Sequence, residues 1–140
     1  MSEQQAQQIL YQIQALEQYL IDLSQKESTL FGILREAGAV IETIRAAGND
    51  SKSETLVPVG MGAYLKANLI DTEKLLLSVG AGAVMEKGRD SALNYLESRI
   101  KEVEIALRET SGQKQEVANA LEQGKLELNR LAQAARSQKK

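Results

Sequence analysis

Residues 9–23 read ILYQIQALEQYLIDL, and their apolar side chains recur at alternating steps of four and three. The stripe in this stretch consists of Ile9, Ile13, Leu16, Leu20 and Leu23. A 4-3 spacing keeps apolar residues on one narrow face of an α-helix and is typical of a coiled coil. The same spacing extends over about residues 3–47, which contain no proline, with Glu27 as a polar member of the stripe. We therefore expect a long first helix that packs on a second one.

A second proline-free region, about residues 90–137, repeats the pattern. Its stripe consists of Leu93, Leu96, Ile100, Val103, Leu107, Thr110, Lys114, Val117, Leu121, Gly124, Leu128 and Leu131. When the helices fold back on each other with Ile44 opposite Leu93, the later stripe residues of the two helices also face each other, layer by layer. Glu27 then faces Thr110 in a layer next to Lys114, so that Glu27 and Lys114 can pair across the seam. The pattern predicts an antiparallel two-helix coiled coil.

The segment between the helices, about residues 49–89, contains the single proline and half of the ten glycines. Runs expected to form strands are residues 55–59, 64–69, 75–79 and 83–86, with turns at Gly60-Met61-Gly62, Asp71-Thr72 and Gly80-Ala81-Gly82. Isolated hairpins are marginal in water and have open edges, so this head is expected to assemble with other chains. The expected assembly residues are the apolar strand positions Leu56, Val57, Val59, Leu65, Leu69, Leu75, Leu77, Val79 and Val84.

The composition excludes most enzyme classes. The 140 residues include no Cys and no His, which removes thiolate nucleophiles, imidazole bases and the usual soft metal ligands. Residues 80–85 have Met85 where a dinucleotide fingerprint needs a third glycine, and no P-loop is present. Charges of both signs are interleaved, with a net charge of −2, which argues against nucleic acid. No run is long enough to span a bilayer. We expect a non-enzymatic, soluble, cytoplasmic protein without cofactor or metal.

The head carries motifs that resemble those of the α-class subunits of archaeal-type prefoldin. They are Thr55-Leu56-Val57-Pro58-Val59-Gly60-Met61-Gly62, Asp71-Thr72-Glu73-Lys74, Ser78-Val79-Gly80-Ala81-Gly82 and Glu86-Lys87. Met61 departs from the pattern, since a small residue is more usual there. The resemblance implies a single prefoldin-like domain over residues 1–140. Its fold would be mainly α with a small β insert: a long antiparallel coiled coil joined by two β-hairpins that form an oligomeric β-barrel head.

The resemblance also implies a function. It predicts a hexamer with β-class subunits that captures unfolded polypeptides without ATP and passes them to a group II chaperonin. The register places Gly124 opposite Ile13 and small residues opposite Leu131, which predicts a partly exposed apolar surface at the arm tips. Its members are Ile9, Leu10, Ile13, Leu126, Leu128 and Leu131, the expected client-binding residues. Alternatively, these side chains merely complete the coiled coil, and the chain is a structural prefoldin-like scaffold or filament-forming subunit without client binding.

Overall fold

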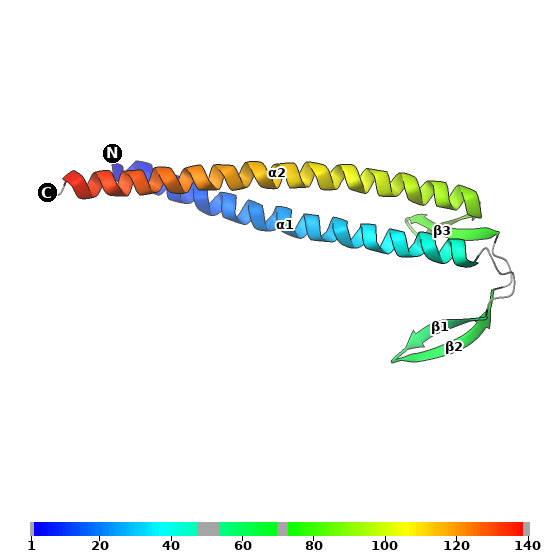
Figure 1. The fold of residues 1–140 in the computed structure, drawn as a ribbon. Coiled ribbons are helices and arrows are strands. Elements are labelled where there is room, and N and C mark those ends of the chain that lie inside the picture. Colours follow the sequence, from blue (N-terminus) through cyan, green and yellow to red (C-terminus); the bar gives the residue numbers. More distant parts are fainter. Residues whose placement is uncertain (1, 48–53, 70–72, 139–140) are drawn as a thin grey trace. The chain divides into compact units, whose positions relative to one another are not determined.

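The computed structural model describes residues 2–47, 54–69 and 73–138. Its elements are α1 (Ser2–Ala47), β1 (Glu54–Gly60), β2 (Ala63–Asn68), β3 (Lys74–Gly80), β4 (Ala83–Gly88) and α2 (Arg89–Gln138) (Figure 1). Two long helices with two antiparallel strand pairs between them confirm the predicted fold class. Gly48-Asn49, a pair that favours a C-terminal helix cap, and the expected turn at Asp71-Thr72 lie outside the described residues. None of the described helices is apolar over a stretch long enough to cross a membrane.

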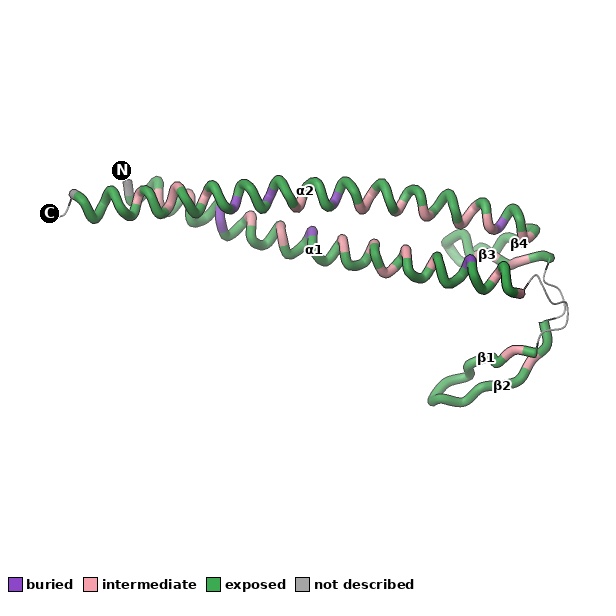
Figure 2. The backbone as a smooth tube through the Cα atoms, viewed as in Figure 1, coloured by how far each residue is buried: buried purple, intermediate pink, exposed green. Residues whose placement is uncertain are grey.

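The chain divides into two compact units. We call Met1–Gly32 with Glu104–Lys140 the terminal unit, and Ile33–Val103 the hairpin unit. Each unit contains a part of both helices, and the hairpin unit also contains all four strands. The buried residues occur singly along the helices, while the strands are almost entirely exposed (Figure 2). Neither unit therefore has the thick core of a globular domain, and packing is concentrated in one seam between the helices.

In the terminal unit, the seam is built from the two predicted stripes. Its core consists of Ile13, Leu23, Val117 and Leu121, with Ile9, Leu16, Leu20 and Leu128 packed against it. A Cβ atom placed on Gly124 would lie 3.2 Å from Cγ1 of Ile13, so these two residues do face each other as predicted. The partner of Glu17 is Lys125, and the partner of Glu27 is Lys114. Since the α2 number falls as the α1 number rises, the helices are antiparallel.

A polar layer interrupts the apolar seam of the terminal unit. Lys114 Nζ lies 3.0 Å from Glu27 Oε1, and the Ser111 hydroxyl donates to Glu27 Oε2 over 2.9 Å. The buried Thr110 satisfies its hydroxyl within the helix, by donating to the Ala106 carbonyl oxygen over 2.8 Å. The predicted pairing of Glu27 with Lys114 is confirmed. A shift of one heptad would separate these partners, so the layer favours one register.

The hairpin unit contains two separate two-stranded sheets, β1–β2 and β3–β4. The turns that connect their strands have the same conformation. Each has the sequence Val-Gly-X-Gly-Ala, at residues 59–63 and 79–83. In the first, Gly60, Met61 and Gly62 all have positive φ angles, of 117°, 51° and 79°. The second repeats this at Gly80, Ala81 and Gly82, with 100°, 52° and 75°. Glycine adopts such angles without steric cost, so the flanking glycines produce the two tight turns predicted.

The second hairpin continues directly into α2. The backbone N–H of Arg89 donates to the Glu73 carbonyl oxygen over 2.8 Å, which extends the β3–β4 pairing to the first residue of the helix. Beyond this point the ammonium of Lys87 lies 4.9 Å from the centre of the Tyr95 ring, a favourable cation–π distance. These interactions fix the end of β4 relative to the first turns of α2 within the hairpin unit.

Candidate functional site

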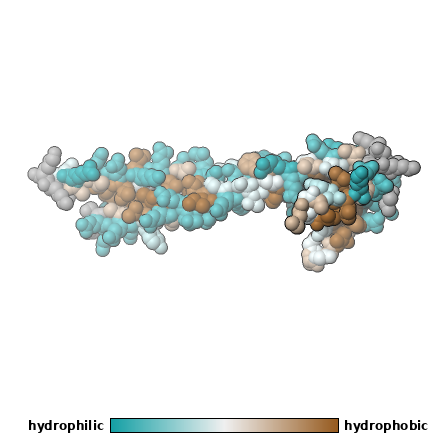
Figure 3. All heavy atoms as spheres, turned by 90° about the horizontal axis from the view of Figure 1, so that it is seen from below, coloured by the Kyte–Doolittle hydropathy of each residue, from teal (hydrophilic) through white to brown (hydrophobic). Residues whose placement is uncertain are grey.

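The hairpins expose most of their apolar side chains. Of the nine expected assembly residues, the exposed ones are Leu56, Val57, Val59, Leu65, Leu69, Val79 and Val84, while Leu75 and Leu77 are half-buried. On the face drawn in Figure 3, apolar side chains gather over the hairpin end of the molecule. A two-stranded sheet with both faces open to water is marginally stable on its own. These strands therefore present an apolar surface suited to burial against another chain.

Strand register shows how the apolar residues of each hairpin are grouped. Val57 pairs with Leu65 across β1–β2, and Leu77 pairs with Met85 across β3–β4. Side chains of directly opposed residues lie on the same face of a sheet, so each pair forms an apolar patch on one face. Sequence reasoning missed Met85, which is exposed. The signal was present, because a turn centred on Ala81 places Met85 opposite Leu77.

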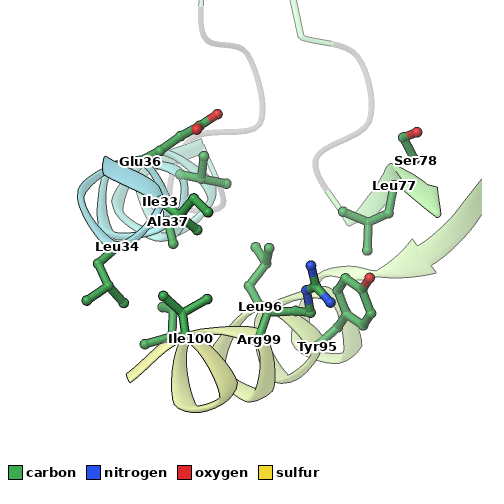
Figure 4. Close-up of a pocket in the computed structure, with 12 residues that line it drawn as sticks. Ile33, Leu34, Glu36, Ala37, Leu77, Ser78, Tyr95, Leu96, Arg99 and Ile100 are labelled. Atoms are coloured by element: carbon green, nitrogen blue, oxygen red, sulfur yellow. The ribbon is translucent and has the colours of Figure 1, made fainter. Parts of the chain in front are cut away.

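One expected assembly residue has neighbours within its own chain. A groove of about 310 Å³ in the hairpin unit is bordered by α1, α2 and β3. It is lined by Ile33, Leu34, Glu36, Ala37, Val40, Leu77, Ser78, Tyr95, Leu96, Arg99, Ile100 and Val103. Figure 4 shows Leu77 pointing toward α2 near Tyr95, while Ser78 points away. The side chain of Leu77 is therefore placed by the helices as well as by its strand.

The start of α1 and the end of α2 form the second candidate surface, in the terminal unit. Leu10 and Leu126 are 46% and 63% exposed. Ile9, Leu128 and Leu131 are half-buried. The predicted exposure of Ile13 is wrong: this side chain is only 5% exposed. The missing side chain of Gly124 brings the backbone of α2 close to Ile13 and covers it, so no opening is left.

Within the described ranges, the titratable groups with a shifted pKa all belong to ion pairs. Hydrogen bonds from Lys114 and then Ser111 lower the pKa of Glu27. A hydrogen bond from Arg130 lowers the pKa of Glu127, and the same bond raises the pKa of Arg130. Across residues 2–47, 54–69 and 73–138, no group of three Asp, Glu, His or Cys side chains could hold a metal ion. The charges of these pairs stabilise helices, and the two apolar surfaces are the candidate functional features.

A family model described as "Prefoldin subunit" matches residues 2–134. The chain belongs to the prefoldin family. This prefoldin chain is 48% identical over 134 residues to "Prefoldin subunit alpha" of Nitrosopumilus maritimus, covering 96% of its own length and 92% of that protein. It is 33% identical over 127 residues to "Prefoldin subunit alpha" of Methanoregula boonei, covering 81% and 83% of the two chains. The relatives identify an α-class subunit of a chaperone family, as the head motifs predicted.

Solved structures share the prefoldin fold at lower identity. The filamentous PFD of Methanocaldococcus jannaschii superposes with a TM-score of 0.71 at 20% identity, over 79% of this chain and 93% of that one. The prefoldin beta subunit of Thermococcus strain KS-1 gives a TM-score of 0.59 at 17% identity, over 89% of both chains. At these identities the likeness concerns the fold, which agrees with the helix–hairpins–helix order found in this prefoldin subunit.

Proposed function

We propose that this prefoldin subunit is part of an ATP-independent holdase that binds unfolded polypeptides and delivers them to a group II chaperonin. The observation that carries the proposal is the family match over residues 2–134, together with exposed leucines where α1 begins and α2 ends. Unfolded chains expose apolar side chains that folded proteins bury, so an apolar surface at this end suits them as ligands. No nucleotide chemistry is needed for such binding.

Assembly through the hairpins is the second part of the proposal. The apolar patch around Val57 with Leu65, together with the exposed Val79 and Val84 of the second hairpin, would be buried against β-class subunits in a cytosolic hexamer. Open strand edges give each hairpin a further means of pairing with a neighbouring chain. The strands would then close into a β-barrel head. Residues 1–140 would act together as one prefoldin-like domain, with the helix pair as its arm.

The proposed client surface consists of Leu10 and Leu126 with the half-buried edges of Ile9, Leu128 and Leu131. Ile13 supports this surface from beneath, because it is buried in the seam. One side chain contributes only about 1.5–3 kcal/mol when fully buried, so each arm would bind weakly. Several arms on one head would together give useful affinity through multivalency, while each contact would still release quickly. Weak contacts of this kind suit a chaperone that has to hand its client on.

Replacing both exposed leucines tests the client surface. Leu10→Ser with Leu126→Ser should leave the helices intact and reduce the suppression of aggregation of a denatured model protein. The matched control is Ile21→Ser with Ile105→Ser, which removes two side chains that are 52% and 53% exposed elsewhere in the terminal unit. The control should keep full protection. Equal protection by both double variants in the assembled complex would move the client site away from this end.

A second candidate function is a scaffold or filament-forming subunit without client binding. It is favoured by the likeness in fold to the filamentous PFD of Methanocaldococcus jannaschii. The two functions differ in their assays. A scaffold would form filaments of this chain alone under the electron microscope and would not protect a denatured protein. Protection by the assembled complex, lost in the Leu10→Ser and Leu126→Ser variant, would favour the holdase.

A further inference from the structure

A shallow groove of about 270 Å³ lies between the first turns of α1 and the last turns of α2. Gln5, Gln8 and Ile9 line it from α1, and Glu127, Arg130 and Leu131 line it from α2. All six residues belong to the terminal unit. The groove combines two half-buried apolar side chains, Ile9 and Leu131, with two exposed side-chain amides. It is therefore more polar than the leucine surface described above, although it shares Ile9 and Leu131 with it.

The amides at this end of α1 have no partners within the part of the chain that the structure describes. Gln4, Gln5, Gln7, Gln8 and Gln12 are exposed, and none of them makes a hydrogen bond to another described residue. Farther along the helices some glutamines are paired, since Gln18 donates to Asp22 over 3.1 Å and Gln115 donates to Asn119 over 3.2 Å. Others, such as Gln14 and Gln25, are exposed without a described partner, but they stand apart and not in a cluster. Tyr11 and four of the five glutamines line a second hollow that shares Gln8 with the groove. Free amides are thus concentrated at the proposed client end.

The charges of the groove neutralise each other. Arg130 donates to both carboxylate oxygens of Glu127, over 3.1 Å from Nε and 2.6 Å from a terminal nitrogen. A two-pronged pair of this kind is geometrically specific, and it holds the guanidinium and the carboxylate to each other. The pKa of Glu127 is lowered and that of Arg130 is raised by this bond, so both stay ionised. The groups left for a ligand are the uncharged amides of Gln5 and Gln8, beside the apolar side chains of Ile9 and Leu131.

An extended polypeptide main chain has the matching chemistry. It carries one N–H donor and one C=O acceptor per residue, and a side-chain amide offers both complementary groups. The two amides of the groove, Gln5 and Gln8, are three positions apart on α1 and are separated by a rise of about 4.5 Å. Successive residues of an extended strand are about 3.4 Å apart. Flexible glutamine side chains can bridge this small difference and reach neighbouring peptide groups of one strand.

We propose that this groove binds the main chain of an extended, uncharged polypeptide segment. Gln5 and Gln8 hydrogen-bond its peptide groups while one of its apolar side chains rests on Ile9 and Leu131. The inference rests on the proposed holdase function and deepens it by naming what the client must present. A folded protein with an exposed apolar patch keeps its main chain paired internally. The amides would therefore select unfolded segments over folded proteins that only have an exposed apolar patch.

Peptide methylation separates main-chain recognition from apolar contact. The probe is a fluorescent, uncharged peptide rich in Val and Leu, compared with the same peptide N-methylated at alternate residues, which removes donors without removing apolar surface. Binding to the assembled full-length chain is followed by anisotropy. Methylation should weaken binding about threefold to tenfold, the effect of losing one or two hydrogen bonds. Gln5→Ala with Gln8→Ala should abolish this discrimination, so that both peptides bind equally.

The control variant is Gln14→Ala with Gln25→Ala, which removes two exposed glutamines of α1 that do not line the groove. This variant should discriminate between the peptides as the unaltered chain does. Equal binding of both peptides by the unaltered chain would overturn the inference alone and leave the holdase proposal in place. Unchanged discrimination by the Gln5→Ala and Gln8→Ala variant would overturn it as well. Failure of both peptides to bind at all would overturn the proposed function together with the inference.

Discussion

A single missing side chain determines how closely the two helices approach in the terminal unit. Gly124 faces Ile13, and a Cβ atom at this position would lie 3.2 Å from Ile13 Cγ1. The sequence predicted which residues meet here, because a heptad repeat specifies the layer. It did not predict that Ile13 would be buried. Side-chain exposure depends on the distance between the helix backbones, and a repeat pattern does not contain that distance.

Two glycines of α2 should respond differently to the same substitution. Gly112 has open space where a Cβ atom would go, so Gly112→Ala should stabilise the chain by about 1 kcal/mol through helix propensity. Gly124→Ala gains the same propensity, but Ile13 must shift to make room, so its net gain should be clearly smaller. Thermal unfolding of both variants followed by circular dichroism measures the difference. Equal increases in Tm would show that Ile13 can shift to make room without a cost in stability.

The pairing of elements was the most predictable level of this fold. The stripes of α1 and α2 fix the register because their polar residues, Glu27 and Lys114, stabilise each other only when neighbouring layers meet. The hairpin turns were predictable because each needs successive positive φ angles, which Gly-X-Gly supplies. The position of Leu77 beside the helices was not predictable. Strand alternation tells which side chains share a face, but not which other element that face will meet.

The polar layer between α1 and α2 should make stability depend on acid pH. The pKa of Glu27 is held below its ordinary value of 4.5 in the folded state, chiefly by the hydrogen bond from Lys114. The unfolded chain therefore takes up the proton first as the pH falls. The stabilising contribution is complete above pH 4.5 and disappears as the pH falls through the lower, folded-state pKa. Glu27→Gln should lower Tm at neutral pH. Below pH 4.5, the Tm of this variant should decrease less steeply with falling pH than that of the unaltered chain.

The exposed Glu116 supplies the control for the acid-pH prediction. It lies on α2 and makes no ion pair with another described residue. Glu116→Gln should leave the slope of Tm against pH close to that of the unaltered chain. A Glu27→Gln variant whose slope below pH 4.5 matched that of the unaltered chain would show that the layer does not contribute to acid sensitivity.

At the scale of the whole molecule, the chain exposes far more surface than a compact protein of its mass. Its accessible surface is 11035 Å², whereas a globular monomer of 15.3 kDa exposes about 7,100 Å². Some of the excess comes from helix faces covered with charged and polar side chains, which water solvates well. The apolar part is concentrated on the strands, where residues such as Leu65 and Val84 are 61% and 58% exposed. Assembly is therefore expected to occur through the hairpins.

Two neighbouring residues of β2 allow that expectation to be tested within one hairpin. Leu65 and Tyr64 are 61% and 59% exposed, but they point to opposite faces, with Leu65 opposite Val57 and Tyr64 opposite Pro58. Leu65→Asp should weaken assembly with a β-class subunit about tenfold to a hundredfold, since it removes one buried leucine from the interface. Tyr64→Asp puts the same charge on the other face and should weaken assembly much less. Native mass spectrometry reports the species formed, and circular dichroism should show unchanged helix content in both variants.

Equal losses of assembly in the two variants would mean that the strand edge, or both faces, contacts the partner. A chain without residues 49–89 that still assembled to full size would place the interface on the helices instead.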